Sequence, residues 1–163
     1  MNVAISADAL ALAAMQLRPQ LDDLRDVVFF SSPALRCRLL AQELAKPQQP
    51  SIVPELAEMD FGSWEGLSWD AVPRHELDAW ADDVWGYRPG GAESAAAVAA
   101  RWYAWSERLK ASTIDTAIAV THAGLIRVAL YCCGLLNASN FSSAAIEFGS
   151  VHRVELHGDR VLT

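Results

Sequence analysis

The sequence predicts an α/β fold, a three-layer α/β/α sandwich built on a mainly parallel sheet. Residues 27–31 and 116–121 contain short apolar runs, which are typical of strands buried on both faces. Helical patterns follow both runs, and an alternation of strands with helices favours a parallel sheet. We expect the two runs to be neighbouring parallel strands. A length of 163 residues is sufficient for one domain with its own core, residues 1–163.

The first third of the chain predicts two helices and a short strand around the first apolar run. Ser6 precedes an Ala- and Leu-rich segment, which predicts a capped helix that extends to about Leu17. After the apolar run, Ser32 fits the N-cap and Pro33 the first position of a second helix. A brief apolar element at residues 51–54 is expected to be a strand.

The middle of the chain, residues 55–91, is irregular and carries four tryptophans. It is too long for an ordinary connection and too aromatic for a disordered one, so we expect it to fold as a cap. The aromatic rings could either hold an aromatic nucleoside or pack on one another, and we favour self-packing.

The last third predicts two helices, the second apolar strand and a hairpin. The first helix is expected from about Glu93 to Lys110, and the second from Ala123 until Gly134 closes it. Residues 150–156 and 161–163 are expected to form a hairpin, which would supply an antiparallel C-terminal strand.

Composition limits the classes of partner. The net charge is −7, from 13 basic and 20 acidic residues, which disfavours nucleic acid. No apolar run approaches the roughly 18 residues that a membrane span requires. Three cysteines show neither metal spacing nor a disulfide framework, so reduced thiols and a cytoplasmic location are expected. A small phosphorylated ligand remains compatible with the charge, and a homodimer is left open.

Polar residues gather where the predicted strands end. Residues 31–36 follow the first apolar run, residues 58–65 follow the short third element, and Thr121-His122 follows the last parallel strand. Ligands of open α/β sheets bind beyond the carboxyl ends of the strands. The sequence therefore predicts a binding site at this edge of the sheet.

Each candidate residue also has a purely structural interpretation. Arg36, in the first turn of a helix, either faces solvent or Asp26, or binds an anion together with the helix N-terminus. His122 is either a structural histidine bonded to backbone or part of the site. Glu58 and Asp60 are either solvated loop residues or, beside an anion site, a source of one general acid.

Four ordered motifs resemble the histidine phosphatase (phosphoglycerate-mutase-like) superfamily. The motif "SSPL-x-R-A" resembles residues 31–37, SSPALRC, and "E-x-DFG-x-WEG" resembles residues 58–66, EMDFGSWEG. The motif "PGGES…R" resembles residues 89–101, with an extra alanine, and "VTHGG-x-IR" resembles residues 120–127, VTHAGLIR. Further residues between Trp69 and Pro89 resemble the α-ribazole phosphatase branch.

The resemblance implies a phosphomonoester hydrolase that works through a phosphohistidine, with no metal and no cofactor. Carried over residue by residue, Arg36 would bind the phosphoryl group, His122 would bind it and stabilise the transition state, and Glu58 would act as general acid and then as general base. The α-ribazole branch implies the dephosphorylation of α-ribazole 5′-phosphate in cobalamin synthesis.

The sequence departs from the family at the nucleophile. The family's nucleophilic histidine lies in an Arg-His-Gly motif at the end of its first strand, and this sequence contains no such motif. Residues 5–9 resemble the family's "L-S-x-x-G", which follows that strand, so we expect the strand to be absent. Cys37 is expected to point away from Arg36. The chain as given should be inactive, with a non-catalytic phosphate-binding or structural remnant as the alternative.

An absent first strand would also change the sheet. In the family this strand lies between the strand that ends at His122 and the antiparallel C-terminal strand. Unpaired interior backbone groups cost about 1 to 3 kcal/mol each. We therefore expect residues 116–120 to pair directly with residues 150–156.

Overall fold

The protein has a small parallel sheet between two layers of helices. The computed structural model describes residues 6–156. The sheet contains β1 (Val27–Ser31), β2 (Ser51–Ile52) and β3 (Thr116–Val120) in the order β2-β1-β3. Strand β3 pairs with β1 in parallel over its whole length, from Val27 opposite Thr116 to Ser31 opposite Val120. The prediction that the two apolar runs are parallel neighbours is confirmed.

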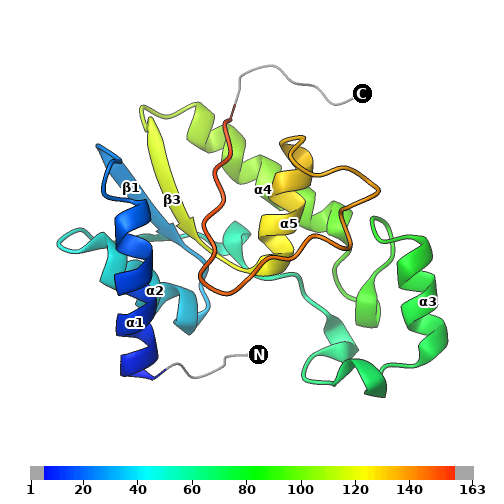
Figure 1. Cartoon of the computed structure of the whole chain (residues 1–163). Helices are drawn as coiled ribbons and strands as arrows, with labels where there is room; N and C mark the ends of the chain where they lie inside the picture. The colour runs from blue at the N-terminus through cyan, green and yellow to red at the C-terminus, as the bar shows by residue number, and fades with distance from the viewer. Residues whose placement is uncertain (1–5, 157–163) are drawn as a thin grey trace.

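Helices cover both faces of the sheet (Figure 1). One face carries α1 (Ala7–Leu17) and α2 (Leu35–Ala45), which pack together. The other face carries α4 (Ala95–Lys110) and α5 (Ala123–Cys132), which form the larger core. This arrangement confirms the α/β fold with helices on both sides of a parallel sheet.

Successive strand residues point to opposite faces, and each face has its own core. Phe29 and Val120 pack against the core of α1 and α2. Phe30 and Ala119 pack against the core of α4 and α5, where the Phe30 ring meets Trp105 edge-on with centroids 5.5 Å apart. The uninterrupted apolar runs therefore reflect a sheet covered on both faces.

One helix start and one helix end follow the predicted capping pattern, and another helix start does not. The Ser6 hydroxyl accepts the amide of Ala9 at 3.2 Å, which caps α1 as expected. Gly134, with φ of 73°, follows the end of α5. Helix α2, however, begins only at Leu35, and Ser32 is not its N-cap. The Ser32 hydroxyl is used by His122 instead, as described below.

The tryptophan-rich segment forms a cap of 3-10 turns and one helix, α3 (Arg74–Asp82), which lies away from α1 and α2 (Figure 1). Its rings pack on one another: Trp69 stacks on Trp80 with centroids 5.8 Å apart, and Trp64 meets Trp80 edge-on at 5.8 Å. The indole of Trp64 donates to Glu76 at 2.8 Å. Three of the four tryptophans thus pack on one another, while Trp85 packs on Tyr131, with centroids 4.9 Å apart, outside the cap.

The prediction of a C-terminal strand at residues 150–156 is wrong. Residues 150–156 form no strand, and β3 pairs only with β1 in the described part of the chain. The segment makes local bonds instead, such as the Ser150 amide to the Glu147 carbonyl at 3.2 Å, and Leu156 packs on the larger core. A side-chain anchor thus replaces the expected ladder, so direct closure of the sheet does not occur. Residues 161–163 lie outside the described residues.

No helix between residues 6 and 156 is both long enough and apolar enough to cross a membrane.

Candidate functional site

The carboxyl ends of β1 and β3 bring Arg36 and His122 together. Ser31 ends β1, and the next residue, Ser32, continues the pairing through its amide, which donates to the Val120 carbonyl at 2.9 Å. Arg36 lies in the first turn of α2, and His122 is the N-cap residue of α5. A terminal nitrogen of the Arg36 guanidinium lies 2.7 Å from Nδ1 of His122. Two predicted site residues that are 86 positions apart are therefore in direct contact.

This contact fixes the protonation of His122. A guanidinium only donates hydrogen bonds, so Nδ1 must be the acceptor and the imidazole is neutral. The proton is then on Nε2, which donates to the Ser32 hydroxyl at 2.7 Å. Burial lowers the pKa of His122 to about 4, and the positive charge of Arg36 acts in the same direction. Within residues 6–156 the His122 ring contacts the side chains of Ser32, Arg36 and Cys37 and no backbone group, unlike a structural histidine of the expected kind.

Cys37 lies against the imidazole, contrary to the expectation that it points away. Its sulfur is 3.6 Å from Nε2 of His122 and 3.6 Å from the Thr121 carbonyl. The first turn of α2 faces the end of β3, so a residue next to Arg36 also reaches this place. Burial raises the pKa of the thiol to about 11, which keeps it protonated and a poor nucleophile at neutral pH.

Glu58 is partly buried and lies at the first turn of α5. Its carboxylate accepts the amide of Met59 at 3.1 Å and the amides of Gly124 and Leu125. Burial raises the pKa of Glu58, while these amides and the charge of Arg36 oppose the increase. Glu58 is therefore not a solvated loop residue.

Asp60, the other acid of the predicted pair, has a local structural role. It is exposed, and its carboxylate accepts the amide of Gly62 at 2.8 Å within its own turn. Of the two acids, Glu58 is the one close enough to Arg36 for the guanidinium charge to affect its pKa.

One model of a protein family matches the sequence. The sequence matches the model of the histidine phosphatase superfamily (branch 1) over residues 10–162. The chain belongs to this superfamily. Among curated proteins, none matches the sequence.

Several solved structures resemble the chain. Mycobacterial glucosyl-3-phosphoglycerate phosphatase Rv2419c is 24% identical with a TM-score of 0.73, over 88% of this chain and 73% of that one. Its complex with inorganic phosphate gives a TM-score of 0.72 at 24% identity, over 89% and 76%. TTHB049 from Thermus thermophilus is 28% identical with a TM-score of 0.62, over 82% and 72%. These similarities support the fold, and the superfamily match spans all three predicted site residues.

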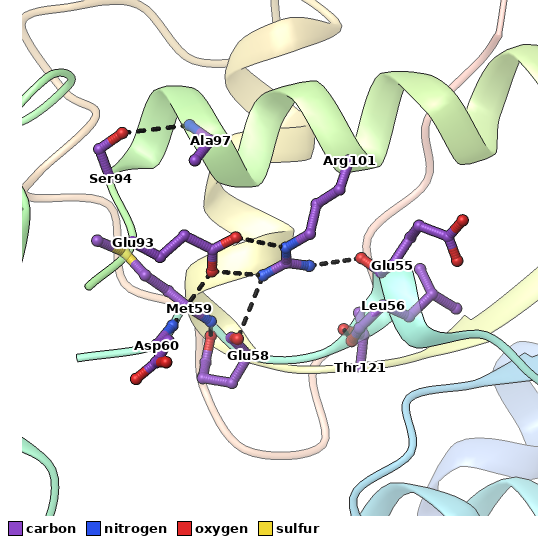
Figure 2. A network of polar contacts seen from close by, with 10 residues as sticks. All are labelled: Glu55, Leu56, Glu58, Met59, Asp60, Glu93, Ser94, Ala97, Arg101 and Thr121. Atoms are coloured by element: carbon purple, nitrogen blue, oxygen red, sulfur yellow. Dashed lines mark hydrogen bonds and ion pairs between the residues drawn. The ribbon is translucent and has the colours of Figure 1, made fainter. Parts of the chain in front are cut away.

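Arg101 holds the segment that carries Glu58 in this histidine phosphatase domain (Figure 2). Its guanidinium forms a two-point ion pair with Glu93, at 2.8 and 3.1 Å. The same group donates to the backbone carbonyls of Glu55 and of Glu58, the latter at 3.2 Å. Through these bonds α4 holds both ends of the segment 55–58. The sequence marked Arg101 only as part of a motif.

A cavity of about 490 Å³ adjoins the site. It is lined by Glu58, Met59, Asp60, Glu65 and Gly66, and Arg36 and His122 are not among its lining residues. Three of the five lining residues are acidic, so this space carries a negative potential beside the cation of Arg36. Among residues 6–156 no cluster of His, Cys, Asp and Glu could hold a metal ion.

Proposed function

We propose that this histidine phosphatase domain binds the phosphoryl group of a small phosphomonoester through Arg36 and His122, with Glu58 as the proton donor to the leaving oxygen. The observation that carries the proposal is the contact between the Arg36 guanidinium and His122 Nδ1 at 2.7 Å. Glu58 lies at the start of α5, the helix of which His122 is the N-cap residue. A guanidinium in the first turn of a helix, beside a histidine, matches the requirements of an anion site.

Binding of an anion by both residues requires a change of proton state. Nδ1 of His122 now accepts from Arg36. It can donate to an anion once the imidazole is protonated, or once its proton moves from Nε2 to Nδ1 and the Ser32 hydroxyl donates to Nε2 instead. A neighbouring phosphate stabilises the imidazolium and so supports this protonation. The raised pKa of Glu58 favours the protonated carboxyl that a general acid needs, and the resulting carboxylate can later activate water.

Transfer of the phosphoryl group also needs an acceptor atom. The family's Arg-His-Gly motif does not occur in this sequence. Ser32 is fully buried, and the Cys37 thiol, with its pKa of about 11, is protonated at neutral pH. We therefore propose that the 163-residue chain on its own binds phosphate without forming a phosphohistidine.

The second candidate function is a non-catalytic phosphate-binding or structural remnant. The lack of an Arg-His-Gly motif in the sequence favours it. The reading frame upstream of Met1 separates the two candidates. A strand that ends in Arg-His-Gly favours the enzyme, and stop codons favour the remnant.

We propose α-ribazole 5′-phosphate as the substrate, with a cytoplasmic location. The resemblance of residues between Trp69 and Pro89 to the α-ribazole phosphatases supports this choice. The acidic cavity supports it as well, because Asp60 and Glu65 would repel a leaving group that carries its own carboxylate. A nucleoside has no such charge.

Titration of the chain with inorganic phosphate, followed by calorimetry, tests the binding proposal. Arg36→Ala should weaken binding at least tenfold, since a charge-assisted hydrogen bond contributes about 1.5 to 3 kcal/mol. Arg38→Ala is the matched control, because Arg38 is on the same helix, two residues further on and exposed, and it should leave the affinity unchanged. Equal effects of the two substitutions would show that binding is non-specific.

Incubation with an aryl phosphate tests whether the chain has a nucleophile that accepts the phosphoryl group. We expect no acid-labile phosphoprotein and no turnover. Turnover that Arg36→Ala abolishes would contradict this and reveal another nucleophile. For the substrate, α-ribazole 5′-phosphate should bind more tightly than 3-phosphoglycerate, and the reverse order would exclude the proposed class.

A further inference from the structure

Gly124 is a glycine that its own backbone does not require. It is the second residue of α5, and its φ is not in the positive range that favours glycine. In a helix glycine is less favourable than alanine, because it loses more conformational freedom on folding. Gly62 and Gly90 differ, since both have positive φ values, of 53° and 59°, and a side chain there would meet backbone atoms. Gly124 therefore needs another explanation.

Space for the Glu58 carboxylate is that explanation. A Cβ atom at residue 124 would lie 2.5 Å from Oε1 of Glu58 and 3.4 Å from its Cδ. The next contact, Met59 Cβ at 3.7 Å, is an ordinary van der Waals distance. The atom in conflict is the end of a flexible side chain and not backbone. A methyl group here would therefore displace the carboxylate and leave the helix in place.

The displaced group matters because α5 holds two of the three site residues in one turn. His122 is the N-cap residue of the helix, and the Glu58 carboxylate accepts amides of its first turn. How closely Glu58 approaches residue 124 therefore determines where its carboxylate lies relative to the start of α5, of which His122 is the N-cap residue.

We propose that Gly124 is a positioning residue, whose lack of a side chain admits the Glu58 carboxylate to the start of α5 and so places the acid beside His122. The assignment of Glu58 as the proton donor rests on the proposed function. The spatial dependence between residues 58 and 124 does not, and it can be tested without any activity.

A double-mutant cycle in urea tests the dependence. In the wild type, Gly124→Ala should lower or leave unchanged the unfolding midpoint, because the gain in helix propensity is offset by the displaced carboxylate. In the Glu58→Ala background the same substitution should raise the midpoint. Glu65→Ala is the matched control: it removes another carboxylate of the same cavity and should not reverse the sign. The same effect of Gly124→Ala in all backgrounds would overturn the proposal.

Carbon-13 NMR of the glutamate carboxyls provides the readout that a purely structural role would not change. Gly124→Ala should lower the Glu58 pKa toward its ordinary value, since the carboxyl leaves its buried place. An unchanged Glu58 titration would overturn the proposal. If Gly124→Ala does not fold, folding of the Glu58→Ala/Gly124→Ala double variant supports it. Failure of the double variant, with Glu58→Ala folded, contradicts it. If residues 58 and 124 are coupled but the chain binds no phosphate, only the proposed function is refuted.

Discussion

The guanidinium of Arg36 lies 2.7 Å from Nδ1 of His122, so the two groups that we propose to bind an anion are in contact with each other. The contact makes His122 a neutral acceptor, with its only N–H directed at Ser32. An anion that engages both residues must therefore compete with this bond, and its negative charge stabilises the protonated imidazole. Anion binding and protonation are coupled at this site.

The coupling predicts that sulfate binds more tightly as the pH falls from 7 toward 4. Sulfate keeps its charge over this range, so the dependence on pH belongs to the protein. Uptake of one proton by His122, whose pKa is about 4, increases the affinity up to about tenfold per pH unit. Calorimetric titrations at several pH values measure it.

Glu58 also titrates near this site, so its contribution has to be separated. Glu58→Gln should keep most of the pH dependence, and His122→Gln should remove it. If His122→Gln keeps the full slope, the proton is taken up elsewhere and the coupling is refuted.

The same histidine predicts acid sensitivity of the fold. The folded-state pKa of His122, about 4, is below its unfolded value of 6.5, so the unfolded state binds the additional proton. Stability from this residue is complete above pH 6.5 and is lost as the pH falls toward 4. Over this shift the loss is about 3 kcal/mol.

Urea unfolding at pH 7 and pH 4.5 measures the loss, with His122→Gln as the reference. Glu58 changes in the opposite sense: its raised pKa favours the folded state at low pH, and this contribution is lost as the pH rises through the folded value. The contribution of Glu58 is the same in the wild type and in His122→Gln if the carboxyl keeps its position. Equal pH dependence of wild type and variant would contradict the assignment to His122.

The sequence predicts the sheet and its helices because these depend on local patterns. Apolar runs identify β1 and β3, and Ser6 and Gly134 mark helix ends through contacts within a few residues. The prediction for Ser32 is wrong for the opposite reason. Its position before Pro33 fits a helix cap, but a histidine 90 residues away uses its hydroxyl. No local pattern contains that information.

The site can be predicted only as far as motifs reach. The sequence places Arg36, Glu58 and His122 at strand ends, but the neutral state of His122 depends on a distance. The roles of Gly124 and Arg101 depend on distances too, since one is defined by the space next to Glu58 and the other by carbonyls of a separate segment. In the sequence these two residues are members of motifs, but nothing local says what either of them contacts.

Substitution of Arg101 should destabilise the fold more than substitution of Arg108, which lies on the same helix. Both are on α4 and both contact Glu55, but the Arg101–Glu93 side chains are only 19% and 20% exposed, while Arg108 is 58% exposed. Arg101→Ala leaves the Glu93 carboxylate and two carbonyls without their donor and should cost about 2 to 3 kcal/mol. Arg108→Ala should cost less than about 1 kcal/mol. Urea unfolding measures the free energy of unfolding of both variants. Similar losses would show that the Arg101 network stabilises the fold no more than an exposed ion pair does.

The open edge of β3 predicts an asymmetry in hydrogen exchange. Strand β1 pairs with β3 over its whole length and with β2 at Phe30 and Ser31, whereas within residues 6–156 β3 pairs with β1 alone. Every residue of β3 is partly exposed, and the strand carries no charge or proline that would discourage another strand from pairing with it. Amides of β3 that do not bond to β1 should therefore exchange much faster than those of Phe30 and Ser31, where β1 has a strand on each side.

Exchange measured by mass spectrometry or NMR at two protein concentrations decides this last prediction. Fast exchange of alternate β3 amides at low concentration, with Phe30 and Ser31 of β1 protected, is the expected result. Protection of β3 that appears only at high concentration shows that a second copy pairs with the edge, as an unpaired strand of this composition permits. Equal protection of β1 and β3 at every concentration contradicts an open edge, because each β3 amide must then have a backbone partner within the same chain.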